Sequence, residues 1–381
     1  MKIAVIGLYY APNLGDAVIC DCVAAWMREA YPSAQVDVID IENSRAFPVH
    51  KQISALTRLR RKWNLRRDQW LTKTGIDDRI YYWNQIDVAS RASFYDEVTG
   101  RGYDAVIFAG GQLFMDWLAL DLCEFLKRFS EKSTPVFFNA CGTGSSFSKK
   151  IENCLAVQMK NSNIKLVSSR DNCVEIEKRY FSGKKCVEQT YDPGLWAKDT
   201  YCIRKEKSTT VGLGIMYDRN IGERCLVRFW EAVIRSLDRR GVAWKMFCNG
   251  DGDDYEYGCH VLKKLGYEPK KCMTDRPVSP EELVRQISEF RSIISFRLHS
   301  HVVAASLGIP GVAVVWDDKL SFFYKHLGHP ERCITVKTGG KQAADILMNA
   351  EREGIDKKMI EHQKTAARAI LLDAVSQVIA V

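Results

Sequence analysis

Short apolar segments recur along this sequence and are separated by longer stretches with a different period. The first segment, 2–7, is rich in β-branched residues and ends at Gly7. Runs of this length and composition are typical of strands buried inside a sheet. The same pattern predicts strands at 36–40, 103–109, 135–139, 165–169, 186–188, 210–215, 242–248, 292–295 and 311–315.

Between most of these segments, apolar residues recur every three or four positions, which is the period of a helix with one buried face. The stretch 17–30, with Val23, Trp26 and Met27, is the first example. The other predicted helices cover 116–130, 151–159, 173–180, 223–239, 254–265, 280–290 and 301–307. Strands that alternate with helices predict an α/β protein whose mainly parallel sheet has helices on both faces.

The alternation occurs in two blocks, and the stretch 202–209 between them is polar. We predict two Rossmann-like, doubly wound domains at 1–201 and 210–381, joined by a linker at 202–209. Packing of the last helix back on the N-terminal domain is left open. Ligands bind at the carboxyl ends of the strands in such domains, so we expect the two domains to face a ligand cleft.

Charge is concentrated in one part of the chain. The formal net charge is +8, and 51–73 holds eight basic residues against one acidic residue. A nucleic-acid-binding domain is basic over a broad face, so we expect no nucleic-acid partner. Within this segment, apolar residues follow a helical spacing beside arginines: Leu56, Leu59, Trp63 and Trp70.

That combination is typical of a helix that lies on a membrane surface. An exposed helix packed on the N-terminal domain is the alternative. A third interpretation places Trp70 and the aromatic residues 81–83 around a sugar.

The thirteen cysteines include no C-x-x-C pair, and their odd number does not support a complete disulfide framework. We therefore predict a reducing, cytoplasmic compartment. No run of 18 apolar residues predicts a membrane span, and the N-terminal apolar run ends too early, at Gly7, for a signal-peptide core.

Polar loops follow the predicted strands of the first block. Asn13, Gly15 and Asp16 lie between the first strand and the first helix. Backbone N–H groups at such a position attract anions, and the side chains can bind hydroxyls. The loop lacks the glycine spacing of a dinucleotide site or a P-loop. A turn with an Asp N-cap is the alternative.

Two further loops have similar positions. Gly110, Gly111 and Gln112 follow a strand, where paired glycines let a ligand approach the backbone; a tight turn explains them equally well. Arg170 closes another strand beside Asp171 and is suited to an oxyanion. A structural Arg–Asp pair is the alternative.

The most informative segment follows the strand at 292–295. Arg297 and His299 are two residues apart, so in extended chain they project to the same side, and we expect His301 to begin the next helix. Lys319 follows the neighbouring strand and should reach the same edge. Two cations and an imidazole suit a substrate with a phosphate and a carboxylate. A metal bound by His299 and His301 is an alternative, but no carboxylate or cysteine has an obvious spacing for a further ligand. A purely structural role for Arg297, His299 and Lys319 is the other alternative.

Taken together, these residues resemble the polysaccharide pyruvyl transferase family over most of the chain. The matching residues are Asn13, Gly15, Asp16, Gly110, Gly111, Arg170, Asp171, Arg297, Leu298, His299, Ala305, Gly308, Pro310 and Lys319. The chain departs from the family pattern at Trp316, where members often have Tyr, and at 141–144, where a Gly-x-Gly-Ile-Gly pattern is common.

The resemblance implies a GT-B-like architecture. It also implies transfer of a pyruvyl group from phosphoenolpyruvate to a pair of sugar hydroxyls during cell-surface polysaccharide synthesis, giving a ketal. The family's phosphoenolpyruvate-binding residues map onto Arg170, Arg297, His299 and Lys319. For the acceptor we expect contacts with Asn13, Gly15, Asp16, Gly110, Gly111 and Gln112.

For catalysis we expect His299 to act as general acid, Arg297 to stabilise the departing phosphate, and Asp16 to orient or deprotonate the acceptor hydroxyl. Because cations can hold the phosphate, we expect no metal and no cofactor besides the co-substrate. If the acceptor is lipid-linked, the basic segment 51–73 would suit the inner face of a membrane. The alternatives are a nucleotide-sugar glycosyltransferase with Glu281 or Glu282 at the ribose, and a non-catalytic glycan-binding protein.

Overall fold

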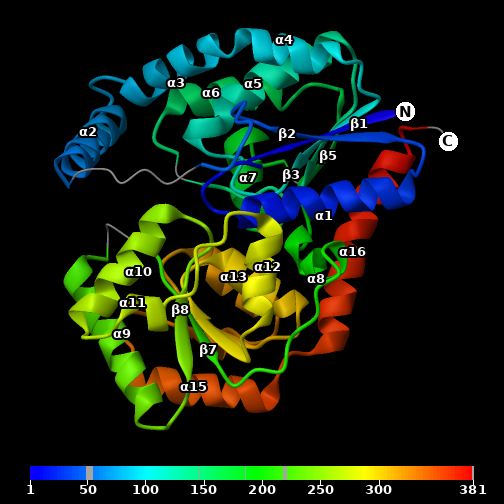
Figure 1. Ribbon diagram of the computed structural model, residues 1–381. Helices are drawn as coiled ribbons and strands as arrows, with labels where there is room; N and C mark the ends of the chain where they lie inside the picture. The colour runs from blue at the N-terminus through cyan, green and yellow to red at the C-terminus, as the bar shows by residue number, and fades with distance from the viewer. Residues whose placement is uncertain (49–54, 145, 185, 218–220, 380–381) are drawn as a thin grey trace. The chain divides into compact units, whose positions relative to one another are not determined.

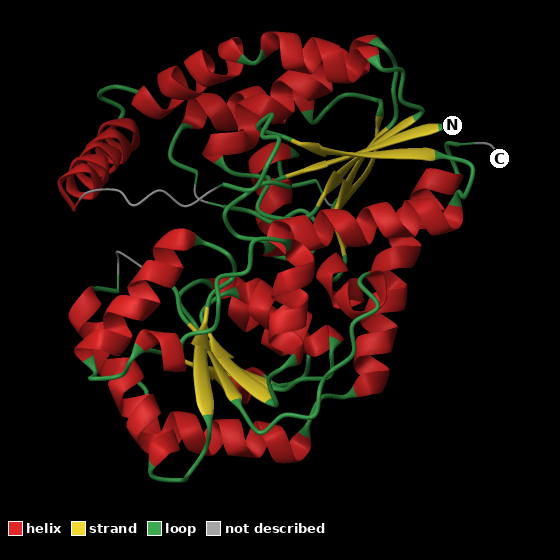
Figure 2. Ribbon diagram, in the orientation of Figure 1, coloured by secondary structure: helices red, strands yellow, loops and turns green. Residues whose placement is uncertain are grey.

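The computed structural model divides the chain into two compact units (Figure 1). Unit 1 consists of Met1–Tyr10, Val23–Asp192 and Ala366–Val381, and unit 2 consists of Ala11–Cys22 and Pro193–Thr365. The residues that the structure describes are 1–48, 55–144, 146–184, 186–217 and 221–379. Each unit contains a parallel β-sheet with helices packed around it (Figure 2), as the sequence pattern predicts.

The sheet of unit 1 has six strands in the order β2-β1-β3-β4-β5-β6, and every neighbouring pair is parallel. The bounds are β1 Lys2–Gly7, β2 Gln35–Asp40, β3 Ala105–Ala109, β4 Val136–Asn139, β5 Ile164–Ser169 and β6 Glu188–Gln189. Strands β3 and β4 are buried along their whole length, which explains why their sequences are continuous apolar runs.

The helices of unit 1 are α2 Ala55–Thr74, α3 Arg79–Ser90, α4 Ala92–Gly100, α5 Asp116–Glu131, α6 Lys149–Gln158 and α7 Cys173–Tyr180. Helices α3 to α7 contribute residues to a hydrophobic core that is rich in aromatic rings. Phe108 of β3 stacks on Phe138 of β4 with ring centroids 4.9 Å apart, and Phe125 of α5 packs edge-on against Tyr95 of α4. The sequence pattern did not predict α3 or α4.

The sheet of unit 2 has five parallel strands in the order β11-β10-β9-β7-β8. The bounds are β7 Val211–Gly214, β8 Trp244–Phe247, β9 Ser292–Ser295, β10 Gly311–Val314 and β11 Cys333–Ile334. Its helices are η1 Pro193–Trp196, α8 Ala197–Thr200, α9 Glu223–Asp238, α10 Gly252–Lys264, α11 Pro269–Cys272, α12 Pro280–Ser288, α13 Leu298–Ser306, α14 Asp318–His326, η2 Pro330–Arg332 and α15 Gly340–Glu353. Helices α1 (Gly15–Ala30) and α16 (Lys357–Ser376) each contribute residues to both units.

The structural division differs from the predicted boundaries of 1–201, 202–209 and 210–381. The change of unit falls after Asp192, because η1 and α8 pack on α13 of unit 2. Trp196 reinforces this packing, since its indole N–H donates to the carbonyl of Lys364 at 3.0 Å. Residues 11–22 also belong to unit 2, where the N–H of Leu14 bonds to the carbonyl of Asn249 at 3.0 Å.

In the described part of the chain, no helix combines the length and the apolar character needed to cross a membrane. All thirteen cysteines are free thiols.

Candidate functional site

Arg297 and His299 lie at the carboxyl edge of the unit 2 sheet, where β9 gives way to α13. Arg297 is the N-cap of that helix, with φ −88° and ψ 125°, and His299 is in the first turn. The expectations that the two residues share an extended segment and that the helix begins at His301 are therefore wrong. The strand ends at Ser295 and helical geometry already begins at Leu298, so the spacing of two residues does not set the side-chain directions.

The imidazole of His299 is buried against the segment 13–16, which precedes α1 in the chain. The side-chain amide nitrogen of Asn13 lies 3.3 Å from Nδ1 of His299 and 3.3 Å from Oδ2 of Asp16. A carboxylate only accepts hydrogen bonds, so these contacts orient the amide with its NH₂ toward both groups. When the ring of His299 is neutral, Nδ1 is then the acceptor and Nε2 carries the proton.

Gly15 fixes the position of the same ring. A Cβ atom built on Gly15 would lie 2.2 Å from Cβ, Cγ and Nδ1 of His299. A glycine is therefore required here by close approach, and its φ is not in the left-handed region. Asn13, Gly15 and Asp16 form one wall of the histidine site within unit 2.

Arg297 is held by a carboxylate that is not among the residues predicted from the sequence. Its Nε and Nη2 donate to Oδ2 of Asp254 at 2.9 and 2.6 Å, and Asp251 lies 3.7 Å from Nη2. Asp254 is buried in α10 and also accepts the N–H of Tyr217 at 2.7 Å. Burial raises the pKa of Asp254 to about 6, and the positive charge of Arg297 opposes that rise.

A signal for Asp254 was available in the sequence. Residues 249–254 read Asn-Gly-Asp-Gly-Asp-Asp and directly follow a predicted strand. Elsewhere in the chain, polar loops at that position predict site residues. Here the pattern predicts only a helix that begins at Asp254.

Lys319 lies at the same edge of the sheet, after β10, which pairs with β9 in the register Ala313↔Ser295. Its ammonium is 3.0 Å from the carboxylate of Asp317 and 5.8 Å from the centre of the Trp316 ring. The indole N–H of Trp316 donates to the carbonyl of Phe296 at 2.8 Å, next to Arg297 in the chain. Unit 2 thus brings Arg297, His299 and Lys319 to one edge.

His301 has a structural role. Its Nε2 donates to the carbonyl of Ser295 at 2.9 Å, and its Nδ1 accepts from the hydroxyl of Tyr324 at 2.8 Å. Burial lowers the pKa of His301 to about 4, so the ring is neutral near pH 7. Because both ring nitrogens are already bonded within the fold, His301 is not available to bind a metal together with His299.

In unit 1, the predicted glycine turn ties two strand ends together. Gly110 and Gly111 have φ of +53° and +68°, which favours glycine at both positions. The N–H of Gly110 donates to the carbonyl of Asn139 at 2.8 Å, and the amide of Gln112 donates to the carbonyl of Thr143 at 2.9 Å. The turn therefore joins the loop after β3 to the loop after β4.

Arg170 also belongs to unit 1, whereas the other three predicted phosphoenolpyruvate residues belong to unit 2. It is buried, with only 4% of its side chain exposed, and forms an ion pair with Asp192. Asp171, the partner suggested by the sequence, is 4.0 Å away. The structure thus gives Arg170 a buried carboxylate partner within unit 1.

The same edge of the unit 1 sheet carries two unsatisfied polar side chains. Asn139 and Thr190 are completely buried, and the described residues offer no hydrogen-bond partner to the Asn139 amide atoms or the Thr190 hydroxyl. A buried donor or acceptor without a partner costs about 1–3 kcal/mol. A bound ligand or water that pairs with them would recover that cost.

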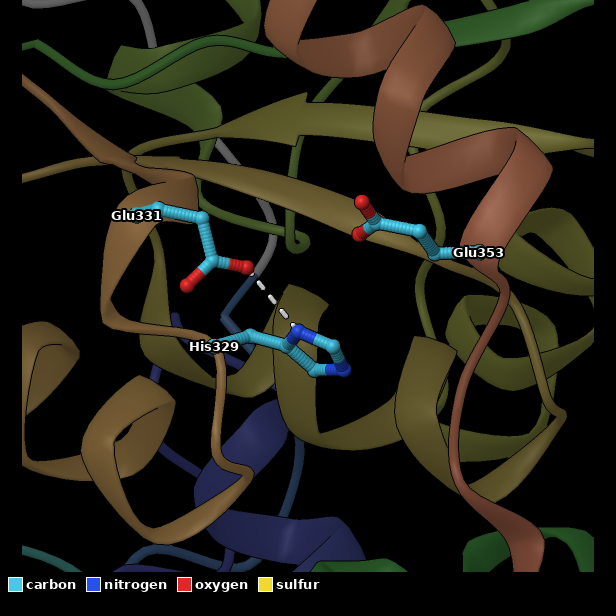
Figure 3. A group of neighbouring side chains, drawn as sticks. All are labelled: His329, Glu331 and Glu353. Atoms are coloured by element: carbon cyan, nitrogen blue, oxygen red, sulfur yellow. Dashed lines mark hydrogen bonds and ion pairs between the residues drawn. The ribbon is translucent and has the colours of Figure 1, made fainter.

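One further group in unit 2 has the composition of a metal site. Atoms of His329, Glu331 and Glu353 lie within 4.8 Å of one another (Figure 3). Arg332 is buried beside them, and its guanidinium is 3.0 Å from Glu353 and 3.8 Å from Glu331. Since an arginine already compensates both carboxylates, we interpret the group as an ion-pair cluster.

Comparisons with solved structures show the fold. An MnaA–UDP complex from S. aureus has a TM-score of 0.57 at 10% identity, covering 100% of this chain and 98% of that one. A putative UDP-N-acetylglucosamine 2-epimerase from Listeria monocytogenes has a TM-score of 0.58 at 11% identity, with coverage of 99% and 96%. They confirm the predicted α/β, GT-B-like fold.

A comparison with curated proteins found no match. A family model, in contrast, matches residues 13–318, well over half of the chain, and is described as polysaccharide pyruvyl transferase. The match includes Asn13, Arg170, Arg297 and His299, as the resemblance of the sequence implied. The chain belongs to the polysaccharide pyruvyl transferase family.

Proposed function

We propose that this chain transfers a pyruvyl group from phosphoenolpyruvate to two hydroxyls of a saccharide, giving a pyruvate ketal and inorganic phosphate. The saccharide would be a cell-surface polysaccharide or its precursor. One observation carries the proposal: in a member of this family, unit 2 gathers Arg297, His299 and Lys319 at one sheet edge. These groups suit a ligand with both a phosphate and a carboxylate.

Arg297 is prepared to bind an oxyanion. Two of its five N–H donors are used on Asp254, and that contact fixes the plane of the guanidinium. The remaining donors can bind the phosphate or the carboxylate in a bidentate manner. Lys319, placed over the Trp316 ring, supplies a second positive charge. No metal or other cofactor is part of this proposal.

His299 is the proposed general acid and would donate a proton from Nε2, because the Asn13 amide faces the other ring nitrogen. That proton is added to the terminal enol carbon, which becomes the methyl group. A sugar hydroxyl forms a bond to C2, and the bond from C2 to the phosphate oxygen breaks with its electrons moving to phosphate. A second hydroxyl then closes the ketal at C2.

The protons balance in this scheme. The two hydroxyls lose two protons, of which one restores His299 and the other leaves with the phosphate. Asp16 is the proposed group that orients or deprotonates an attacking hydroxyl, because its carboxylate lies in the same hydrogen-bonded group as Asn13 and His299.

For the acceptor we propose the carboxyl edge of the unit 1 sheet. Gly110, Gly111 and Gln112 lie there beside Asn139, and Thr190 follows β6 at the same edge; the side chains of Asn139 and Thr190 are buried without partners among the described residues. Amide and hydroxyl groups are suited to sugar hydroxyls, and binding would satisfy them. An Asn139→Ala variant should weaken acceptor binding while leaving phosphoenolpyruvate binding unchanged.

The test compares donors by thermal unfolding and by phosphate release. Phosphoenolpyruvate at 100 times its Kd should stabilise the protein by about 2.7 kcal/mol, and nucleotide sugars should not. With a panel of saccharides, phosphoenolpyruvate should release phosphate. A His299→Ala variant should lose at least about 100-fold in rate. His362→Ala, at an exposed histidine of α16, is the matched control.

Stabilisation by a nucleotide sugar and not by phosphoenolpyruvate would contradict the proposal in favour of a glycosyltransferase. The acidic residues considered for that alternative have other partners. Glu282 accepts the N–H of Val278 at 2.8 Å in a helix cap, and Glu281 pairs with Arg285 at 2.7 Å.

A further inference from the structure

Exposed apolar side chains concentrate in one short part of unit 1. Of the fourteen exposed large hydrophobic side chains among the described residues, seven lie between 63 and 86. We call residues 63–86, which include the end of α2 and most of α3, the α2–α3 surface. Its exposed apolar members are Trp63, Leu65, Trp70, Ile76, Tyr82, Trp83 and Ile86. Scattered exposed apolar residues are normal, whereas exposed apolar side chains that gather on one surface mark an interaction site.

On α2, these aromatic residues share a helix face with basic ones. Trp63 and Trp70 are seven residues apart, which is two helical turns, and Arg66 and Arg67 lie between them at spacings of three and four. Lys73 continues the same face, and all five side chains are exposed. The helix as a whole carries seven basic residues and one acidic residue.

The basic segment predicted from the sequence, 51–73, is only partly visible. Residues 51–54 lie outside the described residues, and so do the side chains of 55–62. The inference therefore rests on the surface from residue 63 onward.

A surface cavity of about 730 Å³ connects this helix face with α3 and α6. Lys73, Ile76 and Tyr82 line it from the α2–α3 surface, and Lys149 and Lys150 line it from the first turn of α6. The ammonium of Lys150 lies 5.4 Å from the centre of the Tyr82 ring. Three lysines and an exposed tyrosine around one cavity suit an anionic headgroup.

Acidic residues at this cavity are already engaged. Asp77 pairs with Arg79 at 2.7 Å, and Asp78 accepts from the hydroxyl of Ser148 at 2.6 Å and from the N–H of Tyr81 at 3.2 Å. Lys149 itself pairs with Glu152 at 3.0 Å, so Lys73 and Lys150 are the lysines that face an incoming anion.

We propose that the α2–α3 surface docks unit 1 on a membrane that contains anionic lipids. Indole rings favour the boundary between headgroups and acyl chains, and arginines beside them bind lipid phosphates. Charge complementarity selects this partner over a second copy of the chain, since two copies of so basic a helix would repel each other. The inference goes beyond the proposed function and does not depend on it.

The test measures binding to vesicles by co-sedimentation. The full-length protein should bind vesicles of phosphatidylcholine with 30% phosphatidylglycerol, and binding to phosphatidylcholine alone should be at least about tenfold weaker. Binding should weaken as salt is raised, because surface charges are screened. Arg66→Gln/Arg67→Gln should lose about 30-fold, which corresponds to about 1 kcal/mol for each arginine.

Two matched controls separate docking from general effects. Trp63→Ser/Trp70→Ser should lose binding by about tenfold or more, whereas Trp117→Ser, at an exposed tryptophan of α5, should bind like the unmodified protein. Arg204→Gln/Arg239→Gln removes the same charge from exposed positions of unit 2 and should have little effect.

Three results would overturn the proposal. One is equal binding to neutral and anionic vesicles. Another is retention of vesicle binding in both the tryptophan and the arginine variants. The third is a concentration-dependent dimer that the tryptophan variant abolishes while vesicle binding stays unchanged. The side chains of Trp63, Arg66, Arg67 and Trp70 are all exposed. The unfolding temperatures of the tryptophan and arginine variants should therefore match that of the parent protein.

Discussion

Gly15→Ala should disable the site through one added carbon atom. A Cβ at this position would lie 2.2 Å from three atoms of His299, whereas ordinary contacts of a Cβ begin at 3.4 Å. The imidazole must therefore move by about 1.2 Å. A displacement of about 1 Å in a catalytic group can cost about 100-fold in rate. Overpacking should also lower the free energy of unfolding by about 1–3 kcal/mol.

The assay is phosphate release from phosphoenolpyruvate with a saccharide acceptor, together with the Kd of phosphoenolpyruvate by calorimetry. We expect kcat to fall about 100-fold and the Kd to change less, since the three atoms nearest to the added Cβ all belong to His299. Gly100→Ala is the control, because a Cβ there has no neighbour within 4 Å and the backbone φ is not in the left-handed region.

The reasoning fails if Gly15→Ala keeps its kcat within about threefold of the parent protein. It also fails if Gly100→Ala loses as much activity as Gly15→Ala, because the loss would then not come from the position of His299. Thermal unfolding of both variants shows whether they remain folded at the assay temperature.

Three further changes test the neighbouring contacts. Asn13→Asp should reduce kcat by about 100-fold or more, and should reduce it further than Asn13→Ala does. The reason is that a carboxylate would accept a hydrogen bond from Nδ1–H and so favour the other tautomer of His299. Steady-state kinetics of both variants check this. Asp254→Asn should weaken phosphoenolpyruvate binding by about tenfold or more in calorimetry. Burial raises the pKa of Asp254 from 3.8 to about 6, so the folded state binds this proton more tightly than the unfolded state. The free energy of unfolding should therefore fall as the pH rises from about 4 to 6. In Asp254→Asn, denaturant unfolding should show a flatter dependence on pH over that range. Arg170→Met leaves Asp192 as a buried charge without its arginine and should lower the free energy of unfolding by about 3–5 kcal/mol. The double variant Arg170→Met/Asp192→Leu removes that charge and should recover most of the loss. If the affinity for phosphoenolpyruvate also returns in the double variant, Arg170 does not bind the donor.

Most of the strands could be predicted because parallel strands buried on both faces leave a strong signal. Strand β9 has the predicted bounds, 292–295, and all four of its residues are buried. The helix α3 was not predicted, because only Ile80, Asn84 and Val88 are buried, and exposed aromatic residues occupy positions between them. The strand β11 has only two residues, which is too short for a periodic pattern.

The candidate site was only partly accessible from the sequence. Arg297 and His299 follow a buried strand, and this placed them at a sheet edge. The contact between Asn13 and His299 joins residues 286 positions apart, and no periodicity reports such a pairing. The pairing of Arg297 with Asp254 and of Arg170 with Asp192 has no sequence signal for the same reason, since tertiary packing brings these distant residues together.

The inclusion of residues 11–22 in unit 2 has a consequence for how this protein can be divided. The chain passes between the units at four points, next to Tyr10, Cys22, Asp192 and Thr365. A recombinant fragment that spans 193–365 would contain Arg297 and Lys319 but would lack Asn13 and Gly15. It would therefore expose the imidazole of His299, and no Asn13 amide would be present to fix which ring nitrogen carries the proton. No single cut yields a self-sufficient half, so complementation between fragments requires the first 22 residues to be supplied along with the second unit.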